Sequence, residues 1–366
     1  MSVSALFAPL TFAHGPAMKN RLMLAPLTNL QSHVDGTMSD DEFRWLTMRA
    51  KGGFGLTMTC ASHVQRIGQG FPGQMGVWSD DHLPGLTRLA AAIKAQDSLA
   101  VIQLHHAGMR SPAAIIGEPP VCPSDNEEFG ARALSAGEVE QLRDDFITAA
   151  VRAKTAGFDG VEIHGAHGYV LSQFLSPEVN QRTDQWGGSP ENRARLVVEI
   201  LAGVRAQCGP DFQIGLRLSP ERFGIDLAET RDLAQRLMTD KAIDYLDMSL
   251  WDVRKTPMDE AFAGQSLMSV FTALDRGDVR LGAAGKVMTP ADALWCLEQG
   301  CDFVLLGRAA ILHHDWPLKV QADPDFKPLP LPVTREHLSR EGLGDAFLNY
   351  MSGWKGFVAE EETIPT

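Results

Sequence analysis

The segment HGAHGY, residues 164–169, places three side chains that could do chemistry within one short stretch. His164 and His167 offer ring nitrogens, and Tyr169, one of three tyrosines in the chain, offers a phenol that can donate a proton. Two histidines at this spacing could ligate a metal, form a structural pair, or hold a substrate oxygen as neutral donors. A catalytic zinc would need a third protein ligand, and nothing in the sequence identifies one. We therefore predict no metal site and leave the other two interpretations open.

A second group of residues has the character of an anion site. Gly285 and the pair Gly307-Arg308 combine glycines, which let backbone N–H groups approach a ligand closely, with an arginine that offers several donors. The same glycines could instead only close tight turns. Arg217 lies within the apolar run QIGLRLSP, where a buried guanidinium must be paired, and an anionic ligand would supply the partner.

Eight short apolar runs alternate with amphipathic stretches along the chain, and this rhythm decides where those residues lie. The apolar runs predict strands over 21–28, 55–62, 99–106, 160–167, 213–220, 245–250, 279–287 and 303–311. The amphipathic stretches predict helices over 41–52, 81–97, 136–156, 190–207, 228–240, 265–275, 290–299 and 315–322. Helix starts are marked by Ser135 with Glu138, by Ser189-Pro190 and by Thr289-Pro290.

This order of elements predicts an α/β fold, a single (β/α)₈ barrel over residues 1–326, because strands buried on both faces read as unbroken apolar runs. A doubly wound sheet is the alternative, which the lack of G-x-G-x-x-G after the first strand weakens. Active sites of such barrels lie at the carboxyl ends of the strands, and phosphates bind after the seventh and eighth, where Gly285 and Gly307 fall. We expect residues 327–366 to form a C-terminal extension that packs on the barrel or on a partner subunit.

Composition narrows the classes of function. The 366 residues carry 33 Lys and Arg against 46 Asp and Glu, a net charge of −13 that argues against nucleic-acid binding. No apolar run is long enough to cross a membrane and no signal-peptide pattern opens the chain, so we expect a cytoplasmic protein without a membrane partner. The five cysteines are scattered and never form C-x-x-C, which predicts reduced thiols rather than disulfides or a metal cluster.

Over residues 1–320 the sequence resembles the Old Yellow Enzyme family of FMN-dependent NAD(P)H oxidoreductases, also called ene-reductases. The resemblance runs through NRLMLAPLTN, GVWSDDH, VIQLHHAG, GFDGVEIHGAHGYVLSQFLSP, NQRTDQWGGSPENRARLVVEI, GLRLSP and FVLLGRAAI. The segment from Gly157 to Arg195 is the most distinctive part of it.

The resemblance implies roles for individual residues. Ala25, Pro26, Leu27 and Thr28 would form the wall under the flavin ring; Gln103, Arg217 and Cys60 would contact its pyrimidine end; and Gly285, Gly307 and Arg308 would hold the FMN phosphate. His164 and His167 would hold the activating oxygen of the substrate, and Tyr169 would donate the proton. One branch of the family has cysteine where this chain has Thr28 and tyrosine where it has Leu30, and completes its site with a neighbour's C-terminal segment that residues after Phe326 do not resemble.

The implied reaction is a ping-pong cycle. NADPH or NADH would reduce FMN, and an activated alkene, an α,β-unsaturated carbonyl or nitro compound, would then take the hydride as Tyr169 protonates it. The partners would be small molecules, with a homo-oligomer as one expectation for the assembly. Two alternatives remain: a metal-dependent barrel hydrolase or lyase that uses the HGAH pair, and a flavoprotein that senses redox state without catalysis.

Overall fold

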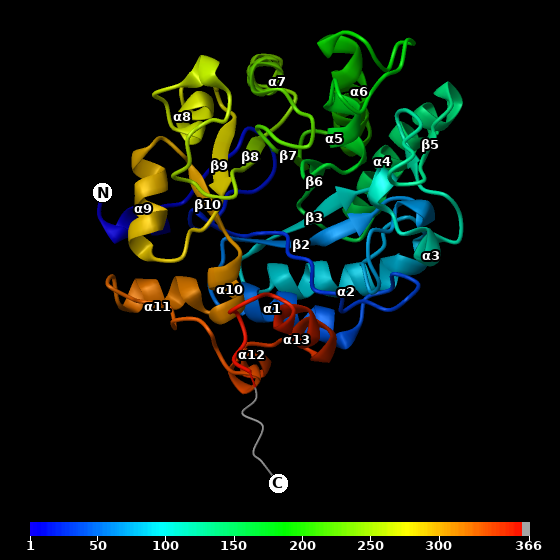
Figure 1. Ribbon diagram of the computed structural model, residues 1–366. Coiled ribbons are helices and arrows are strands. Elements are labelled where there is room, and N and C mark those ends of the chain that lie inside the picture. Colours follow the sequence, from blue (N-terminus) through cyan, green and yellow to red (C-terminus); the bar gives the residue numbers. More distant parts are fainter. Residues whose placement is uncertain (361–366) are drawn as a thin grey trace.

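The computed structural model describes residues 1–360 of the chain. Eight parallel strands close into a barrel in the order β1-β10-β9-β8-β7-β6-β3-β2, and helices surround it (Figure 1). The barrel strands are β1 (Leu22–Leu24), β2 (Leu56–His63), β3 (Leu99–His105), β6 (Gly160–Gly165), β7 (Gln213–Leu218), β8 (Tyr245–Ser249), β9 (Arg280–Ala284) and β10 (Phe303–Leu306). The predicted (β/α)₈ barrel is therefore confirmed, because each predicted strand lies in the closed sheet.

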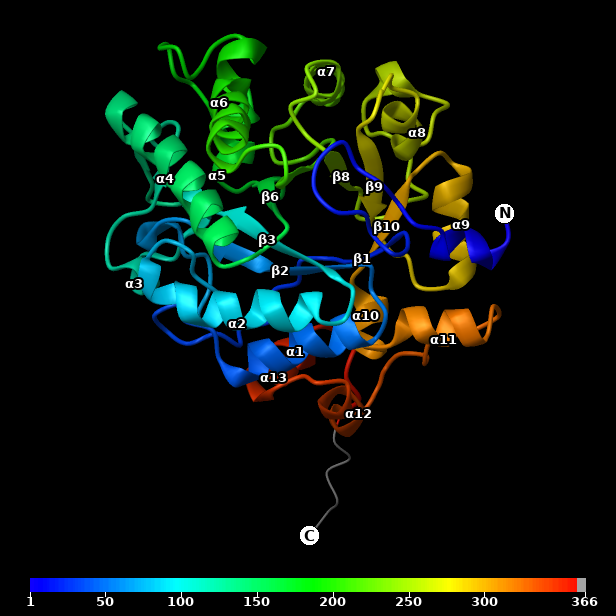
Figure 2. The ribbon, with the colours of Figure 1, turned by 180° about the vertical axis from the view of Figure 1, so that it is seen from behind.

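The outer layer of helices follows the predicted alternation (Figure 2). It consists of α1 (Asp40–Lys51), α2 (Leu83–Lys94), α4 (Ala136–Thr155), α6 (Pro190–Cys208), α7 (Leu227–Thr239), α8 (Leu267–Thr272), α9 (Pro290–Glu298) and α11 (Trp316–Ala322). Shorter elements are α3 (Ala113–Ile116), α5 (Val170–Leu175), α10 (Arg308–Leu312) and the two-stranded sheet of β4 (Val121–Cys122) and β5 (Arg132–Ala133). No helix among the described residues is both long and apolar enough to cross a membrane.

Local signals explain where the helices begin. The Ser135 hydroxyl accepts from the Glu138 backbone N–H while the Glu138 carboxylate accepts from the Ser135 N–H, which satisfies two donors that a helix start leaves free. Thr289 and Asp292 form the same reciprocal pair before α9, where Pro290 occupies the first turn. These predicted helix starts are confirmed.

Several strands are shorter than the apolar runs that predicted them. The eighth run, 303–311, is a strand only to Leu306, and Arg308–Leu312 form α10. Gly307 turns the chain between them, with φ −102° and ψ −88°, a conformation outside the strand and helix regions. The fourth run ends as a strand at Gly165 rather than at His167. Apolar residues continue past each strand end because the turn that follows is buried as well.

The barrel interior is divided into an apolar floor and a polar upper layer. The floor consists of side chains such as Met23, Met58 and Phe303, and Tyr245 packs against Phe303 with ring centroids 5.8 Å apart. Nearer the carboxyl ends the interior side chains are Gln103, Glu162, Arg217 and Asp247, all buried. The change from apolar to polar side chains marks the end of the barrel where a ligand can bind.

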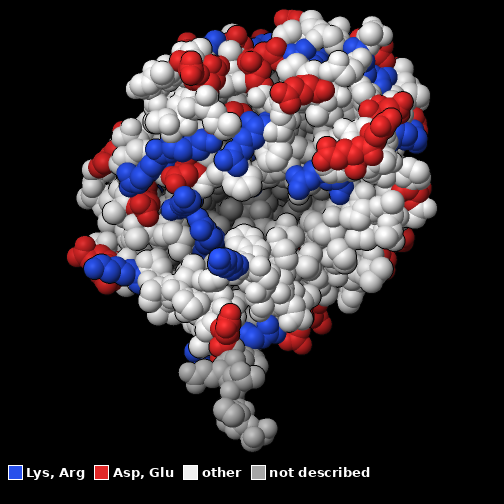
Figure 3. Space-filling view, in the orientation of Figure 1, with Lys and Arg blue, Asp and Glu red and all other residues white. Residues whose placement is uncertain are grey.

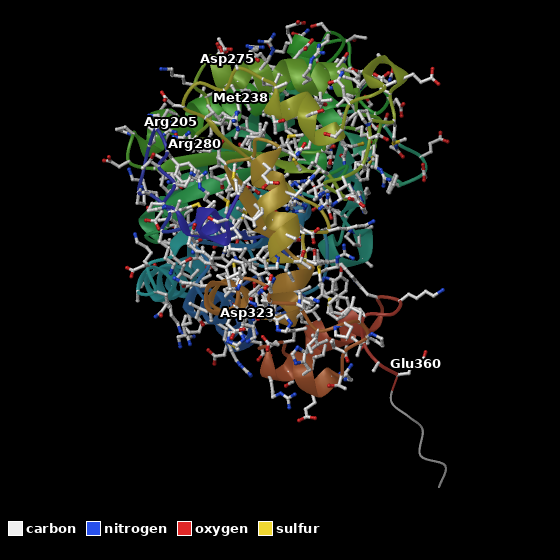
Figure 4. The ribbon with its side chains drawn as sticks, turned by 90° about the vertical axis from the view of Figure 1, so that its left-hand side faces the viewer. Arg205, Met238, Asp275, Arg280, Asp323 and Glu360 are labelled. Carbon is white, nitrogen blue, oxygen red and sulfur yellow. The ribbon has the colours of Figure 1, made fainter. Side chains whose placement is uncertain are left out.

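Two helices of the extension, α12 (Arg335–Arg340) and α13 (Asp345–Ser352), pack beside α1 on the barrel of the same chain (Figure 1). Trp45 meets Phe347 edge-to-face at 4.8 Å, and the buried Arg49 donates to the backbone oxygens of Glu341 and Ala310. In Figure 4 the chain leaves Asp323 and reaches Glu360 at the edge of the molecule. The extension therefore packs on its own barrel, and residues 361–366 of the predicted segment lie outside the described part.

Candidate active site

A cavity of about 600 Å³ opens at the carboxyl ends of the strands, and a smaller one adjoins it. Both are lined by Pro26, Leu27, His167, Tyr169, Arg217, Tyr350 and Trp354, so they form one continuous site. The structure brings nearly all of the predicted residues to this site: Ala25, Pro26, Leu27, Thr28, Gln103, His164, His167, Tyr169, Arg217, Gly285, Gly307 and Arg308.

Cys60 is the exception, and its assignment to cofactor binding is corrected. Its side chain is buried in the apolar layer outside the cavity, and the next residue, Ala61, lines the cavity. Successive strand residues face opposite sides of a sheet, so an error of one position reverses the direction of the side chain. The resemblance placed the contact at Cys60, one position before Ala61, in a part of β2 where the register shifts between Met58 and Ala61.

The histidines and the tyrosine converge because the strand ends early. After Gly165 the chain turns through His167 (φ 64°) and Gly168 (φ 70°), so the two histidines do not alternate across a sheet. The ring centroid of His164 lies 5.0 Å from that of His167 and 5.2 Å from that of Tyr169. Within residues 1–360, two groups of side chains are spaced closely enough to hold a metal, and neither includes His164 or His167. The structure therefore provides no third protein ligand for a metal held by these two histidines.

Hydrogen bonds indicate which nitrogen of His164 carries its proton. Its Nδ1 accepts from the Ala166 backbone N–H at 3.2 Å, so in the neutral ring the proton is on Nε2, which can donate to a ligand. His167 Nε2 lies 2.7 Å from the Ser249 hydroxyl. Burial lowers the pKa of His167 to about 3, and it lowers the pKa of His164 well below the usual range. Both rings are therefore neutral donors at physiological pH.

We expect KM for a neutral enone to be independent of pH between about 5 and 9, because neither histidine changes charge in that interval. Each lowered pKa means that the neutral form persists well below pH 6.5. Burial raises the pKa of Tyr169 above its usual 10, so the phenol also keeps its proton over the same interval. Steady-state kinetics with 2-cyclohexenone at saturating reductant would check this. A KM that decreases as the pH falls through about 6.5 would show that an imidazolium holds the oxygen instead.

A buried polar network lies beside the histidines. Arg217 Nε is 3.0 Å from Asp247 Oδ2, so a carboxylate of the protein supplies the partner that the sequence led us to expect from a ligand. This contact is not aligned as a hydrogen bond, so the buried Arg217 Nε and Asp247 Oδ2 have no hydrogen-bond partner among the described residues. Gln103 Nε2 donates to Glu162 Oε1 at 2.7 Å, which leaves the amide oxygen of Gln103 as a free acceptor. Burial together with the nearby Asp247 charge raises the pKa of Glu162.

The opposite end of the cavity is built from glycines and cations. A Cβ on Gly285 would lie 2.8 Å from the Asp252 backbone nitrogen, so only glycine fits there. Lys286 and Arg308 line the same end, and Lys286 Nζ is 2.9 Å from Asp252 Oδ2. Arg308 has no carboxylate partner within the described chain. Exposed backbone and an unneutralised guanidinium are the donors that a phosphate requires.

Backbone strain is concentrated at the rim of the site. Within residues 1–360, eight non-glycine residues have positive φ, and five of them are His167, Arg222, Phe223, Trp251 and Lys286. Four of these five line the cavity. A left-handed conformation of a bulky residue costs energy and is kept where the fold imposes it, most often at functional sites. The loops after β6, β7, β8 and β9 are thus built to direct their side chains into the cavity.

Several lining residues were not predicted from the sequence. Tyr350, Met351 and Trp354 come from the C-terminal extension, and Phe71 and Arg110 come from the loops after β2 and β3. Phe71 and Arg110 could have been predicted to line the site, because each lies in a loop that follows a barrel strand. No local sequence pattern marks Tyr350, Met351 and Trp354 as lining residues, because their position at the cavity depends on how α13 packs on α1.

Comparisons with known proteins agree with this geometry. The family model described as "NADH:flavin oxidoreductase / NADH oxidase family" matches residues 5–325. The chain is 39% identical to a probable NADH-dependent flavin oxidoreductase, YqiG, of Bacillus subtilis (strain 168), over 86% of this chain and 87% of that one. It is 33% identical to an NADPH dehydrogenase of the same strain, over 90% and 98%. The structure of the old yellow enzyme homologue from Zymomonas mobilis superposes with a TM-score of 0.78 at 29% identity, covering 93% of this chain and 99% of that one.

Proposed function

The chain belongs to the NADH:flavin oxidoreductase / NADH oxidase family, to which the old yellow enzymes belong, and from this premise we propose that it reduces activated alkenes. It is an NAD(P)H-dependent flavin oxidoreductase with FMN as its cofactor. The proposed substrates are α,β-unsaturated carbonyl or nitro compounds. The observation that carries the proposal is the meeting of Tyr169, His164 and His167 in the same cavity as the candidate flavin-binding residues.

The cavity fits FMN by its chemistry. Gly285, Gly307 and Arg308 would hold the phosphate, since they combine close backbone approach with a free guanidinium. Ala25, Pro26, Leu27 and Thr28 would form the wall beside the ring. The free Gln103 oxygen and the Arg217 guanidinium, which lines the cavity, suit the mixed donors and acceptors of a pyrimidine edge. When bound, FMN would supply the hydride chemistry, since it can accept a hydride and pass it on.

The protein's own groups would direct that hydride. His164 Nε2–H and the His167 ring would donate to the carbonyl or nitro oxygen of the substrate, which polarises the C=C bond and stabilises the negative charge that develops on the oxygen. The β-carbon then receives the hydride, and the Tyr169 hydroxyl delivers a proton to the α-carbon. The alkene gains one hydride and one proton in all; the hydride originates from NAD(P)H, which becomes NAD(P)⁺, and Tyr169 supplies the proton and is reprotonated from solvent. One open cavity serves both reactants, so we propose that they bind in turn.

An absorbance spectrum of the purified protein tests the proposed function directly. We expect a flavin spectrum that bleaches with anaerobic NADPH or NADH and returns when 2-cyclohexenone is added. A flavin that bleaches but is not reoxidised by any enone or nitroalkene would contradict the proposed substrate class and favour the redox-sensor alternative.

Replacing both histidines, His164→Ala with His167→Ala, should weaken the binding of a phenol such as methyl 4-hydroxybenzoate by about 10- to 100-fold. Two neutral hydrogen bonds, each contributing about 1 kcal/mol, would be lost. Titration calorimetry on the oxidised holoenzyme would measure the change. The FMN content of the variant is the control, and unchanged affinity for the phenol would remove the histidines from the oxygen-binding role.

A further inference from the structure

The active-site cavity is lined by cations although the protein as a whole is acidic. Its lining includes Arg110, Arg217, Lys286 and Arg308 and no aspartate or glutamate, whereas the chain carries a net charge of −13. Figure 3 shows basic side chains gathered around the hollow on this face. An accumulation of one sign of charge inside a cleft attracts ligands of the opposite sign.

The four lining cations differ in what neutralises them. Arg217 is paired with Asp247 at 3.0 Å, and Lys286 with Asp252 at 2.9 Å. Arg308 lies at the end of the cavity where the FMN phosphate is proposed to bind. Arg110 remains: within residues 1–360 it has no carboxylate partner, and no part of the proposed cofactor site uses it.

Arg110 lies on the substrate side of the cavity. Its guanidinium carbon is 4.8 Å from the centroid of the Tyr169 ring, and its Nη1 donates to the backbone oxygen of His167. A guanidinium has five N–H donors, so most of them remain for a ligand. Arg110 therefore borders the residues that would receive the substrate.

The loop that carries Arg110 is held firmly from behind. Gly108 adopts φ +63°, and a Cβ there would lie 2.3 Å from Gln173 Oε1. The buried Gln173 accepts from the Met109 N–H at 3.2 Å and donates to the Ala107 and Gly168 oxygens. Gln173 thus joins the loop after β3 to the turn that carries Tyr169, which positions Arg110 before any ligand arrives.

We propose that Arg110 binds an anionic group, a carboxylate or phosphate, of a molecule that reacts in this cavity, and so determines its specificity. This inference rests on the proposed function, since it names the chemistry of that function's substrate or reductant. An anion beside Arg110 would form charge-assisted hydrogen bonds in a partly water-excluded site. The anion could belong to the alkene or to the nicotinamide dinucleotide, and the arms of the experiment separate these sources.

A binding experiment tests the proposal without turnover. The probes are 4-hydroxybenzoate and its methyl ester, which share the ring and the phenol and differ in one negative charge. If the alkene carries the anion, calorimetry on the oxidised holoenzyme should show that 4-hydroxybenzoate binds at least about tenfold more tightly than the ester. Arg110→Gln should abolish this preference and Arg110→Lys should keep part of it. Arg254→Gln is the matched control, because Arg254 lies on the loop that carries Trp251 but does not line the cavity.

Two kinetic arms identify the source of the anion. If the alkene carries it, Arg110→Gln should raise KM about tenfold for 3-maleimidopropionate and leave KM for N-methylmaleimide unchanged. If the reductant carries it, the two phenols should bind alike, and Arg110→Gln should raise the Kd of NADPH or NADH about tenfold in anaerobic flavin reduction.

Other outcomes overturn the proposal. Unchanged phenol preference together with unchanged reductant affinity would show that Arg110 binds no anion. An equal loss of rate with neutral and anionic alkenes would show that it acts only through Tyr169. These failures differ from a failure of the proposed function, in which the flavin is reduced and the phenols bind but no alkene reoxidises it.

Discussion

Tyr169→Phe should slow alkene reduction by about 10²- to 10⁴-fold while the reduction of the flavin by NAD(P)H proceeds at its normal rate. In the proposed function, only the oxidative half-reaction needs a proton at the α-carbon, so only that half would depend on the hydroxyl. Burial raises the pKa of Tyr169, which keeps the phenol protonated at neutral pH. Anaerobic stopped-flow absorbance of the flavin measures each half-reaction separately.

The reductive half-reaction is the internal control for this variant. The Tyr169 hydroxyl has no hydrogen-bond partner among the described residues, so its removal breaks no bond within the protein and the fold should be kept. Equal oxidation rates of the reduced variant and wild type by 2-cyclohexenone would assign the proton transfer to another group. Slowing of both half-reactions alike would point to a change in flavin binding.

Arg217→Met should cost about 3–5 kcal/mol in the free energy of unfolding and greatly reduce the retention of FMN. The guanidinium is 7% exposed and its partner Asp247 is fully buried, so the variant would leave a carboxylate without a counter-charge in the barrel interior. Chemical unfolding monitored by circular dichroism would give the free energy. The ratio of flavin to protein absorbance would give the retention of the cofactor.

A second variant separates folding from cofactor binding. Arg217→Met combined with Asp247→Asn removes both charges of the pair, so it should recover much of the stability but not the FMN. If the double variant also recovers FMN, Arg217 serves the fold and not the cofactor. If Arg217→Met unfolds no more easily than the wild type, the pair is not a stabilising contact.

The barrel could be predicted from the sequence because its signals are local. Each strand is an apolar run buried on both faces, and helix starts such as Ser135 and Thr289 use short-range hydrogen bonds that are visible in the residue order. Strand ends were less predictable, since the apolar runs continue into buried turns such as the one at Gly307. Cys60 was placed at the cavity where Ala61 lies, because an error of one position within β2 reverses the direction of the side chain.

The candidate site was predictable where it depends on strand ends and not where it depends on distant packing. His164, Tyr169 and Arg217 follow or end barrel strands, so the fold itself brings them together. Tyr350 and Trp354 reach the cavity because α13 packs on α1, through contacts such as the Trp45 ring with the Phe347 ring, whose centroids are 4.8 Å apart. Such a contact joins residues far apart in the chain, and neither segment has a sequence pattern that predicts it.

The closure of the barrel also constrains how the protein is made. Strand β1 pairs with β10, so the nascent chain keeps an open strand edge until Leu306 has emerged from the ribosome. The cavity needs a longer chain still, because Trp354 forms part of its wall. Until then unpaired strands and unburied apolar faces are exposed to other nascent chains and to chaperones. The capacity to bind cofactor is therefore acquired late in synthesis, after β10 and Arg308 have emerged.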